Sequence, residues 1–457
     1  MPFIRSISGL RATLGDNMTP ALIADYGSAF AKYSPKGPIV IGRDGRPSGE
    51  WIEQILTGTL TACGREVRLL GVVPTPTVQM RVEHTPAAGG IAITASHNPK
   101  EWNGMKFINS NGVFLDKDEN NRLWDIADNK EFDYVEQIEK KPIVNTEAIN
   151  DHIKKIIDLP IFSGTNVLDN INNSGIIAAI DSVNSSGSVA VPSLLAKLRI
   201  ESIRLFCDGT GIFPHTPEPV PENLNDLAVT VKMSKSDIGI AVDPDADRLV
   251  LIDETGNPIG EELTITLAVK AVMKFIRHFQ REGEPCIVVN HSTTRRVEDI
   301  AAHYGAKVYR SPVGEINVVK MMKEKGAIIG GEGSGGVILP ACHYGRDSLV
   351  GIALIMALMA EEGKPLSQIV SDLPEYKMIK TKSPVSGDIS SEFDRIKAEF
   401  SGFEIIEDDG IKLIQGKRWV QLRASNTEPI IRIIAEAETI EQANDLIDKV
   451  KSILKTS

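Results

Sequence analysis

Apolar and polar positions follow one plan three times along this chain. In each case a short apolar run is followed by a polar loop, a stretch of helical period and a second apolar run. The three repeats span residues 38–70, 176–207 and 286–309. Strand–loop–helix–strand units of this kind build mainly parallel α/β sheets. The pattern therefore predicts three similar α/β domains in tandem.

The C-terminal part of the chain has a different pattern. Short apolar runs at 403–407, 411–415, 419–423 and 430–436 are separated by turns, and 439–455 gathers its apolar side chains on one helical face. This predicts a smaller α+β domain. Polar stretches and turns place the boundaries of the expected domains, which are 1–150, 151–256, 257–372 and 373–457.

Composition and charge narrow the class of protein. Of 457 residues, 42% are hydrophobic and 24% charged, which is typical of a soluble globular protein. The net charge of −11 argues against a nucleic-acid partner but leaves room for a small anionic ligand in a local basic cleft. The four cysteines lie far apart, which predicts neither a disulfide framework nor a zinc site and suits a reducing cytoplasm.

Targeting and membrane signals are weak. The N-terminus has no apolar signal core, and the longest apolar stretch, 349–360, is too short to span a bilayer and predicts a buried helix. We therefore expect a cytoplasmic protein without a membrane partner.

The first stretch with candidate chemistry is 91–107. Ile91–Ile93 predicts a buried strand, which ends in a turn at Asn98-Pro99. Ser96 lies at this strand end, with His97 beside it and Lys106 further on. A hydroxyl beside a base and a cation suits a nucleophile or a phosphate carrier. Taken alone, the pattern favours the alternative, a Ser/Asn turn that satisfies its own backbone.

The second stretch follows a predicted strand at 237–242. Three carboxylates occupy alternate positions there: Asp243, Asp245 and Asp247. Such oxygen ligands suit Mg²⁺. An EF-hand loop is the rival interpretation, but Arg248 stands where that loop requires glycine, and no helix precedes it. A metal-free acidic turn is disfavoured, because three neighbouring carboxylates repel one another unless a cation neutralises them.

The third stretch is glycine-rich, at 330–336. It contains a literal G-x-G-x-x-G, but an apolar run stopped by Pro340 follows where a dinucleotide site needs a helix. We therefore prefer a loop that binds a polyol through Glu332 and Ser334. A Gly-rich hairpin turn is the alternative.

The fourth stretch, 423–429, holds Arg423 and two hydroxyl residues, with Arg432 beyond. Arginines, hydroxyls and loop amides make an oxyanion cradle. An ordinary loop with surface arginines is the alternative, mainly for Arg432. The chain has no Walker A sequence, which disfavours a P-loop ATPase.

Together and in this order, the four stretches resemble the α-D-phosphohexomutase superfamily, and the resemblance covers essentially the whole chain. Residues 8–11 and 42–49 add supporting matches. The resemblance implies four domains around one cleft, each contributing one loop. The loops would carry the phosphoserine (Ser96), magnesium (Asp243, Asp245, Asp247), the sugar (Glu332, Ser334) and a phosphate (Arg423, Ser425, Asn426, Thr427).

The resemblance also implies a reaction. Phospho-Ser96 gives its phosphoryl group to a hexose monophosphate, and the bound 1,6-bisphosphate reorients and returns its other phosphate. Mg²⁺ would be held by Ser96 and the three Asp, and a hexose 1,6-bisphosphate would be the activator. Arg248 would contact the phosphoserine, and Lys106 or His97 would transfer a proton or stabilise charge. The remaining substrate contacts would be Arg11, Glu315 and Arg432.

The identity of the sugar depends on departures from the family pattern. Gly336 and Glu315 stand where several glucose and mannose phosphate mutases have histidines, and an acidic residue at 315 is similar to phosphoglucosamine mutases. Thr94 is instead similar to the mannose/glucose branch. We expect a phosphoglucosamine mutase, with phosphomannomutase/phosphoglucomutase as the alternative. A non-catalytic sugar-phosphate binder and a phosphatase are weaker alternatives. We also expect a monomer or homodimer, and a hinge near 371–383.

Overall fold

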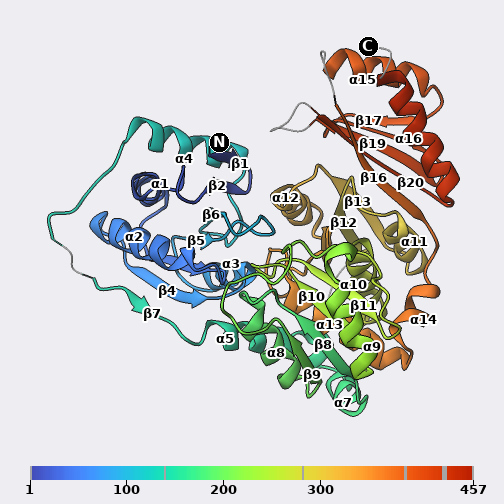
Figure 1. Cartoon of the computed structure of the whole chain (residues 1–457), viewed down its shortest axis with the longest axis horizontal. Helices are drawn as coiled ribbons and strands as arrows, with labels where there is room; N and C mark the ends of the chain where they lie inside the picture. The colour runs from blue at the N-terminus through green and yellow to red at the C-terminus, as the bar shows by residue number, and fades with distance from the viewer. Residues whose placement is uncertain (1–2, 138–139, 280–282, 385–388, 425–429, 455–457) are drawn as a thin grey trace.

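Four sheets follow one another along the chain. The computed structural model describes residues 3–137, 140–279, 283–384, 389–424 and 430–454. Figure 1 shows the parts built on these sheets in an arc, from the blue N-terminal part through green and yellow to the red C-terminal part. We call them the first to fourth modules. Three α/β modules and a smaller C-terminal one confirm the predicted fold class.

The first module is built on a seven-stranded mixed sheet of order β1-β2-β6-β5-β3-β4-β7. Its strands are β1 (Ile4–Ser6), β2 (Gly9–Thr13), β3 (Ile39–Arg43), β4 (Val67–Val72), β5 (Gly89–Ile93), β6 (Trp102–Asn109) and β7 (Ile143–Val144). Its helices are α1 (Pro20–Tyr33), α2 (Ser48–Ala62), α3 (Thr75–Glu83) and α4 (Lys117–Asn129). The continuous apolar runs of β3 and β5 suit strands buried on both faces. Lys106 lies on β6 and pairs with Ala92 of β5.

The second and third modules each have a four-stranded sheet, of order β11-β10-β8-β9 and β13-β12-β14-β15. The second holds β8 (Ile177–Asp181), β9 (Glu201–Leu205), β10 (Ile238–Val242) and β11 (Leu249–Asp253), with α5 (Ala148–Ile157), α6 (Pro160–Ser163), α7 (Val167–Asn173), α8 (Gly187–Lys197) and α9 (Asn225–Ser234). The third holds β12 (Cys286–Asn290), β13 (Lys307–Ser311), β14 (Ile329–Glu332) and β15 (Gly336–Ile338), with α10 (Glu262–Lys274), α11 (Arg296–His303), α12 (Glu315–Lys325), α13 (Ser348–Glu362) and α14 (Leu366–Ser371).

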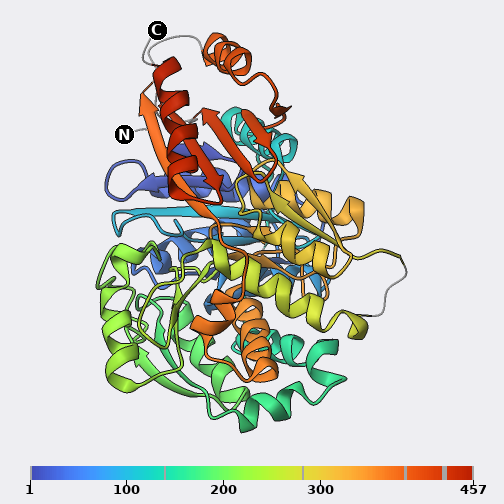
Figure 2. The same ribbon diagram turned by 90° about the vertical axis from the view of Figure 1, so that its right-hand side faces the viewer.

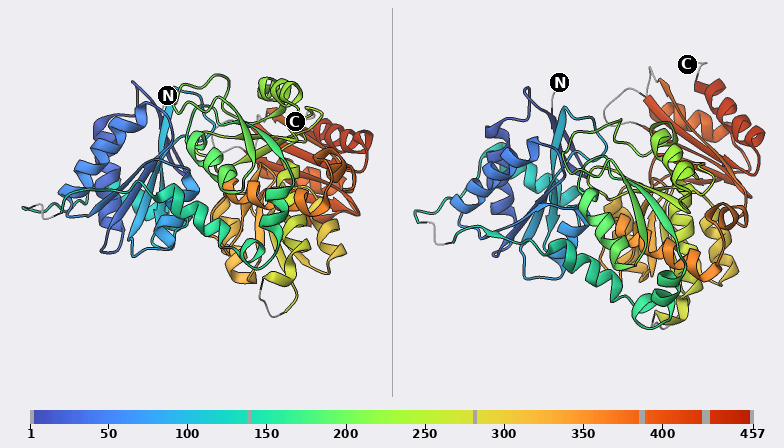
Figure 3. Two further views of the ribbon diagram at one scale, coloured as in Figure 1. Left: turned by 90° about the horizontal axis from the view of Figure 1, so that it is seen from below. Right: turned by 60° about the horizontal axis from the view of Figure 1, so that its bottom comes forward.

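One hydrophobic core serves both of these modules. It runs from Ile153 of α5 to Ile369 of α14, and α13 is its central helix. Figure 3 shows this orange helix among the green and yellow elements. Every residue from Ser348 to Met359 is buried, because α13 is apolar on all sides and has neighbours all around. The helix predicted at 349–360 is therefore confirmed.

The fourth module is a five-stranded antiparallel sheet of order β16-β20-β19-β18-β17. Its strands are β16 (Lys377–Pro384), β17 (Glu404–Ile406), β18 (Ile411–Gln415), β19 (Arg418–Ala424) and β20 (Ile430–Ala437), and its helices are α15 (Ile389–Glu399) and α16 (Ile440–Leu454). Figure 2 shows the orange segment that leaves α14 and enters this sheet as β16.

Two elements were not predicted from the sequence, helix α15 and strand β16. β16 begins inside the stretch 371–383, where a hinge is expected, and the hinge stays a prediction. β16 holds three lysines and no fully buried side chain, so it lacks the continuous apolar face that marks a strand in sequence.

None of the four cysteines, all of which are described, forms a disulfide. In the described ranges no helix is long and apolar enough to cross a membrane.

Candidate active site

A cavity of about 440 Å³ lies where the four modules meet. Nine of the residues singled out from the sequence line it: Arg11, Ser96, Lys106, Arg248, Glu315, Glu332, Ser334, Arg423 and Arg432. The three Asp residues lie buried beside Ser96 and Lys106. Ser425, Asn426 and Thr427 lie outside the described residues. The structure therefore brings all four motifs to one place, with the centre of the fourth still a prediction.

Ser96 lies just beyond β5 in a strained turn. Its φ of 49° is in the left-handed region, which non-glycine residues occupy mainly where the surroundings enforce it. The Thr94 hydroxyl does so from one side, accepting from the Ser96 N–H at 2.8 Å and donating to Asp44 at 2.6 Å. Arg46 does so from the other, donating to the carbonyl oxygens of Ser96 and Asn98 at 2.5 and 2.7 Å. The turn is thus fixed by this buried frame in addition to its own backbone hydrogen bond, from the Asn98 N–H to the Ala95 carbonyl oxygen at 3.1 Å.

Asp44 and Arg46 form a buried ion pair. Both lie in the stretch 42–49, which supports the family resemblance in the sequence but has no role assigned to it there. The Arg46 Nε lies 3.0 Å from the Asp44 Oδ2, and both side chains are buried. The pair comes from the loop after β3, which neighbours β5 in the sheet. The signal in the sequence was the dense Gly-Arg-Asp-Gly-Arg-Pro loop at 42–47.

The loop that carries Asp243, Asp245 and Asp247, which we call the Asp loop, faces the Ser96 turn across the boundary of the first two modules. The Ser96 hydroxyl donates to the Asp243 Oδ2 at 2.8 Å. The Lys106 ammonium donates to the Oδ2 atoms of Asp245 and Asp247 at 2.6 and 3.1 Å. The loop is held by its own backbone, because the Asp243 Oδ1 accepts from the N–H groups of Asp247 and Arg248 at 3.2 Å.

The buried carboxylates of the Asp loop differ in the direction of their pKa shifts. Burial, with the neighbouring carboxylates, raises the pKa of Asp243 well above its usual range. Burial acts in the same direction on Asp247, but the Arg346 and Lys106 cations outweigh it and hold the Asp247 pKa well below its usual range. The repulsion foreseen from the sequence is therefore partly relieved by cations of the protein itself.

The same loop fits a divalent cation. Ligand oxygens of Asp243, Asp245 and Asp247 lie within 4.8 Å of one another. The Oδ1 atoms of Asp245 and Asp247 are buried without a hydrogen-bond partner in the described structure. Buried carboxylate oxygens without donors favour a hard cation such as Mg²⁺, which takes oxygen ligands.

The two candidates for proton transfer differ in charge. Burial opposes the charged form of Lys106, but Asp245 and Asp247 raise its pKa, so it stays an ammonium. Burial and the Arg248 cation lower the pKa of His97 to about 2, which makes its imidazole neutral. The His97 Nδ1 lies 3.3 Å from the Ser96 Oγ. Of these two side chains, Lys106 is therefore the cation and His97 the neutral group.

Arg248 keeps part of its guanidinium free. Its Nε is buried without a hydrogen-bond partner among the described residues. The side chain lies 3.9 Å from Asp247 and 4.0 Å from Glu218. An unsatisfied guanidinium N–H beside the cleft is suited to a phosphate oxygen.

Arg346 was not found from the sequence and connects two of the predicted motifs. Its three nitrogens donate to Asp247 at 2.6 Å, Glu315 at 3.0 Å and Glu332 at 2.8 Å. The Asp loop and the glycine-rich stretch at 330–336, which we call the sugar loop, thus share one buried cation. The only signal in the sequence was an arginine two residues before a buried helix, which carries little information by itself.

The glycine-rich sugar loop is a hairpin that also lines the cleft. The hairpin turn and the ligand-binding loop are therefore compatible interpretations of this stretch. β14 and β15 pair antiparallel, with Glu332 opposite Gly336. The Glu332 carboxylate accepts from Asn290 at 2.8 Å and from the Gly314 N–H at 3.1 Å. Glu315 accepts from Gln79 of the first module at 2.9 Å, and burial raises its pKa to about 7.

Three cations lie in one row across the fourth sheet. Arg423 of β19 is the direct partner of Arg432 of β20, which is in turn the partner of Lys382 of β16. Side chains of directly opposite residues lie on one face of a sheet, so three like charges lie close together. In the described part of the chain, Arg423 alone of the three has an ion pair, with Asp409 at 2.8 Å. Such a row can hold an anion, and Lys382 is a member that the sequence did not reveal.

The chain matches models of one protein family along most of its length. Four models of the phosphoglucomutase/phosphomannomutase family match it in order: alpha/beta/alpha domain I over 4–134, domain II over 150–256, domain III over 264–376 and the C-terminal domain over 381–453.

Individual relatives match over nearly the whole length. The chain is 34% identical over 451 residues to a phosphoglucomutase/phosphomannomutase of Thermococcus kodakarensis, covering 96% of each. It is 31% identical over 455 residues to a probable phosphoglucosamine mutase of Methanopyrus kandleri, covering 98% of this chain and 97% of the other. A phosphoglucomutase/phosphomannomutase family protein from Burkholderia thailandensis has the same fold, with a TM-score of 0.84 at 23% identity over 99% and 98% of the two chains.

The fold and the cleft define an isomerase that works as an intramolecular phosphotransferase. The chain belongs to the phosphoglucomutase/phosphomannomutase family, within the α-D-phosphohexomutase superfamily.

Proposed function

We propose that this chain interconverts a hexose 6-phosphate and a hexose 1-phosphate through phospho-Ser96, and that glucosamine phosphate is its preferred substrate. The observation that carries the proposal is the Ser96 hydroxyl, fixed 2.8 Å from Asp243 inside a cleft shared by four modules. A hexose 1,6-bisphosphate is the bound intermediate and the activator. Ser96 both gives and takes back one phosphoryl group, so the phosphate count of the substrate is conserved.

The residues around Ser96 have different roles in this transfer. Ser96, Asp243, Asp245 and Asp247 would hold Mg²⁺, which would supply positive charge opposite the transferring phosphoryl group. Lys106 and Arg248 add fixed cations. His97 takes the Ser96 hydroxyl proton when the phosphate returns. A phosphate dianion beside the imidazole favours its protonated form and so opposes the lowering of the His97 pKa.

The opposite side of the cleft holds the phosphate that is not reacting. Among the described residues, the row of Arg423, Arg432 and Lys382 has one ion-pair partner, Asp409, so a phosphate dianion relieves its repulsion. Ser425, Asn426 and Thr427 complete this cradle in the proposal. Arg11 also lines the cavity and donates to Asn98 of the Ser96 turn at 2.8 Å.

Glu315 supports glucosamine phosphate over its rivals. Its carboxyl lines the cleft and, with a pKa raised to about 7 by burial, is only partly ionised at neutral pH. An ammonium group on the sugar stabilises the ionised form of this carboxyl, whereas a hydroxyl group does so much less. Glu332 and Ser334 contribute acceptors for the other hydroxyl groups. Glucose and mannose phosphates remain the alternative substrates, in line with the first relative described above.

One kinetic series tests the proposal. kcat/KM is measured on glucosamine, glucose and mannose 1-phosphates, with Mg²⁺ and the matching 1,6-bisphosphate present. Glucosamine 1-phosphate should give the highest value, and chelation of Mg²⁺ should stop turnover. Ser96→Ala should lower turnover by at least about a thousandfold, because the phosphoryl carrier is lost.

Ser163→Ala is the matched control, since that hydroxyl only contacts backbone carbonyls of its own segment. Undiminished turnover in Ser96→Ala contradicts the mechanism. A preference for mannose or glucose phosphate contradicts only the choice of substrate.

A further inference from the structure

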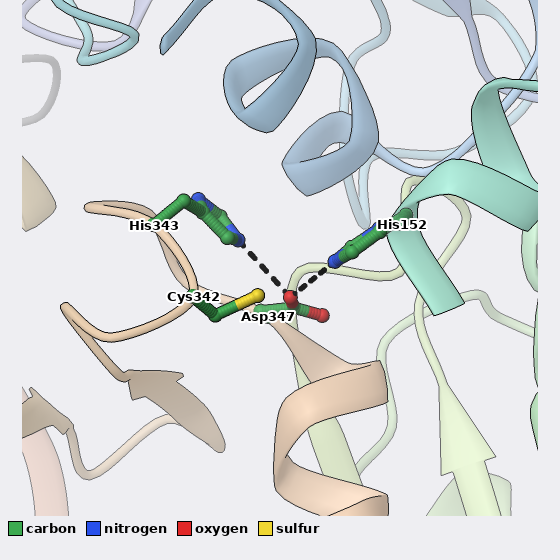
Figure 4. A group of neighbouring side chains, drawn as sticks. All are labelled: His152, Cys342, His343 and Asp347. Atoms are coloured by element: carbon green, nitrogen blue, oxygen red, sulfur yellow. Dashed lines mark hydrogen bonds and ion pairs between the residues drawn. The ribbon is translucent and has the colours of Figure 1, made fainter. Parts of the chain in front are cut away.

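A second group of ligating side chains is buried outside the cleft that holds Ser96. It consists of His152, Cys342, His343 and Asp347, and all four are almost completely buried (Figure 4). His152 comes from α5, and the other three come from the connection between β15 and α13. None of them takes part in the reaction proposed above.

The four donor groups converge on one small volume. One donor atom from each lies within 4.8 Å of all the others. The Nε2 atoms of His152 and His343 lie 2.8 and 3.0 Å from the same oxygen, the Oδ2 of Asp347. In Figure 4 both rings point at this oxygen, with the Cys342 thiol beside it. The other oxygen of Asp347 accepts from the Leu349 N–H at 2.8 Å, so the start of α13 fixes the carboxylate.

We propose that His152, Cys342, His343 and Asp347 bind one transition-metal cation, with Zn²⁺ the best-suited ion. Two imidazoles, a thiolate and a carboxylate form a closed set of four ligands of the kind that Zn²⁺ takes in tetrahedral sites. Sulfur and nitrogen donors disfavour Mg²⁺ and Ca²⁺, which take oxygen ligands. Cysteine spacing predicted no zinc site, because only one of these ligands is a cysteine and His152 is remote in sequence.

The charges of the proposed ligands match those of the ion. The Cys342 thiolate and the Asp347 carboxylate carry two negative charges, which balance the two positive charges of Zn²⁺. The thiol proton leaves as the metal binds. The buried cluster with its metal is therefore neutral, which avoids the cost of an uncompensated buried charge.

Hydrogen bonding alone accounts for only part of the cluster. It explains the contacts of the two histidines with Asp347, but no hydrogen bond to the Cys342 sulfur is found in the described structure. Burial raises the pKa of this thiol well above its usual range, and the nearby Asp347 charge adds to that effect. A bound cation reverses the preference and makes the thiolate a ligand.

Two residues of the first module contact the segments that carry the four ligands. The His152 Nδ1 lies 2.9 Å from the Thr77 hydroxyl, which accepts a hydrogen bond once His152 binds metal through Nε2. The His84 Nε2 lies 2.8 Å from the Cys342 carbonyl oxygen. Asp347 also directly follows Arg346 of the cleft. The site thus ties three modules together next to the residue that joins the Asp and sugar loops.

Metal content of the intact protein tests the proposal independently of catalysis. The full-length chain is incubated with Zn²⁺, gel-filtered and measured by plasma mass spectrometry. Wild type and Asp245→Asn should each keep about one Zn²⁺ per chain. Cys342→Ser and His343→Ala should keep less than about a tenth of that. Cys286→Ser is the matched control, a buried cysteine outside the cluster, and should keep the metal.

X-ray absorption of the zinc-loaded wild type decides the case even if a variant fails to fold. The spectrum should show one sulfur neighbour at about 2.3 Å and nitrogen or oxygen neighbours at about 2.0 Å. A wild type that keeps no zinc, a spectrum without a sulfur neighbour, or full zinc content in Cys342→Ser would each overturn the proposal.

Discussion

Arg346 joins side chains that three distant segments bring to the cleft. Its guanidinium donates to Asp247, Glu315 and Glu332, each within 3.0 Å. The planar, forked geometry of arginine allows one cation to hold three carboxylates in fixed directions. We therefore regard Arg346 as a positioning residue that keeps the Asp loop in register with the sugar loop.

Arg346→Lys should lower kcat/KM by about 10- to 100-fold, since one ammonium cannot span three carboxylates and charge-assisted hydrogen bonds contribute about 1.5–3 kcal/mol each. The loss should fall on kcat and on Mg²⁺ affinity together, because Asp247 is displaced. Arg395→Lys is the control, on helix α15. Steady-state kinetics at several Mg²⁺ concentrations measure both effects, and an unchanged Mg²⁺ dependence would count against a positioning role.

Glu315 should make the stability of the chain depend on pH. Its pKa is raised by burial to about 7 in the folded chain, above the value of an exposed glutamate. Between these two values the folded chain binds the extra proton, so stability falls as pH rises towards 7. The melting temperature of wild type should drop more between about pH 5 and about pH 8 than that of Glu315→Gln, which cannot ionise. Parallel melting curves for the two proteins would contradict this.

At the scale of elements, the fourth sheet concentrates charge on one face. Cross-strand pairing places Lys382, Arg432 and Arg423 side by side, although they are far from adjacent in sequence. Residues alternate between the two faces of a strand, so Lys377 of the same strand β16 points to the opposite face. The sheet thus has one cationic face. Lys377, on the other face, serves as a control for substitutions of Lys382.

Lys382→Ala should raise KM for the sugar phosphate about 3- to 10-fold with little change in kcat, because one partly exposed charge contributes about 1 kcal/mol to holding a phosphate. The dependence of KM on salt should weaken as well. Lys377→Ala should leave both quantities unchanged. Equal effects of the two substitutions would show that the row is not the phosphate site.

At the scale of the whole molecule, the fourth module is docked through polar contacts to the third. Glu436 is buried and accepts from two groups of the third module, the Thr294 hydroxyl and the Arg295 N–H at 2.8 Å. It also accepts from the Trp419 indole N–H of its own module at 2.7 Å. Lys380 binds Glu261 and Glu262 at 2.7 and 2.9 Å. An interface of hydrogen bonds and ion pairs, with little shared hydrophobic core, is suited to opening and closing.

Glu436→Gln should loosen this docking, because the amide offers one acceptor oxygen and turns two N–H groups towards donors. Leaving buried donors unpaired costs about 1–3 kcal/mol. Calorimetry should show the fourth module unfolding at a lower temperature than the rest. Glu438→Gln is the control, an exposed residue paired with Lys417. A single unshifted transition in Glu436→Gln would contradict the interpretation of this interface.

The sequence by itself determined the fold class and the chemical character of three of the four loops that line the cleft. Apolar runs and helical periods are local properties, so they predicted the strands that carry Ser96, Asp243 and Glu332. Each motif alone left a structural alternative open, and only their order along the chain favoured one family.

Tertiary structure decided what these residues contact. The frame of Asp44 and Arg46, the position of Arg346 and the cation row through Lys382 all depend on contacts between segments far apart in sequence. The sequence of β16 alternates too little between apolar and polar residues to predict a strand. The sequence of α13 predicts a buried helix but does not indicate which modules pack around it. Such features follow from how sheets and helices pack, because packing brings together side chains whose separation along the chain carries no periodic signal.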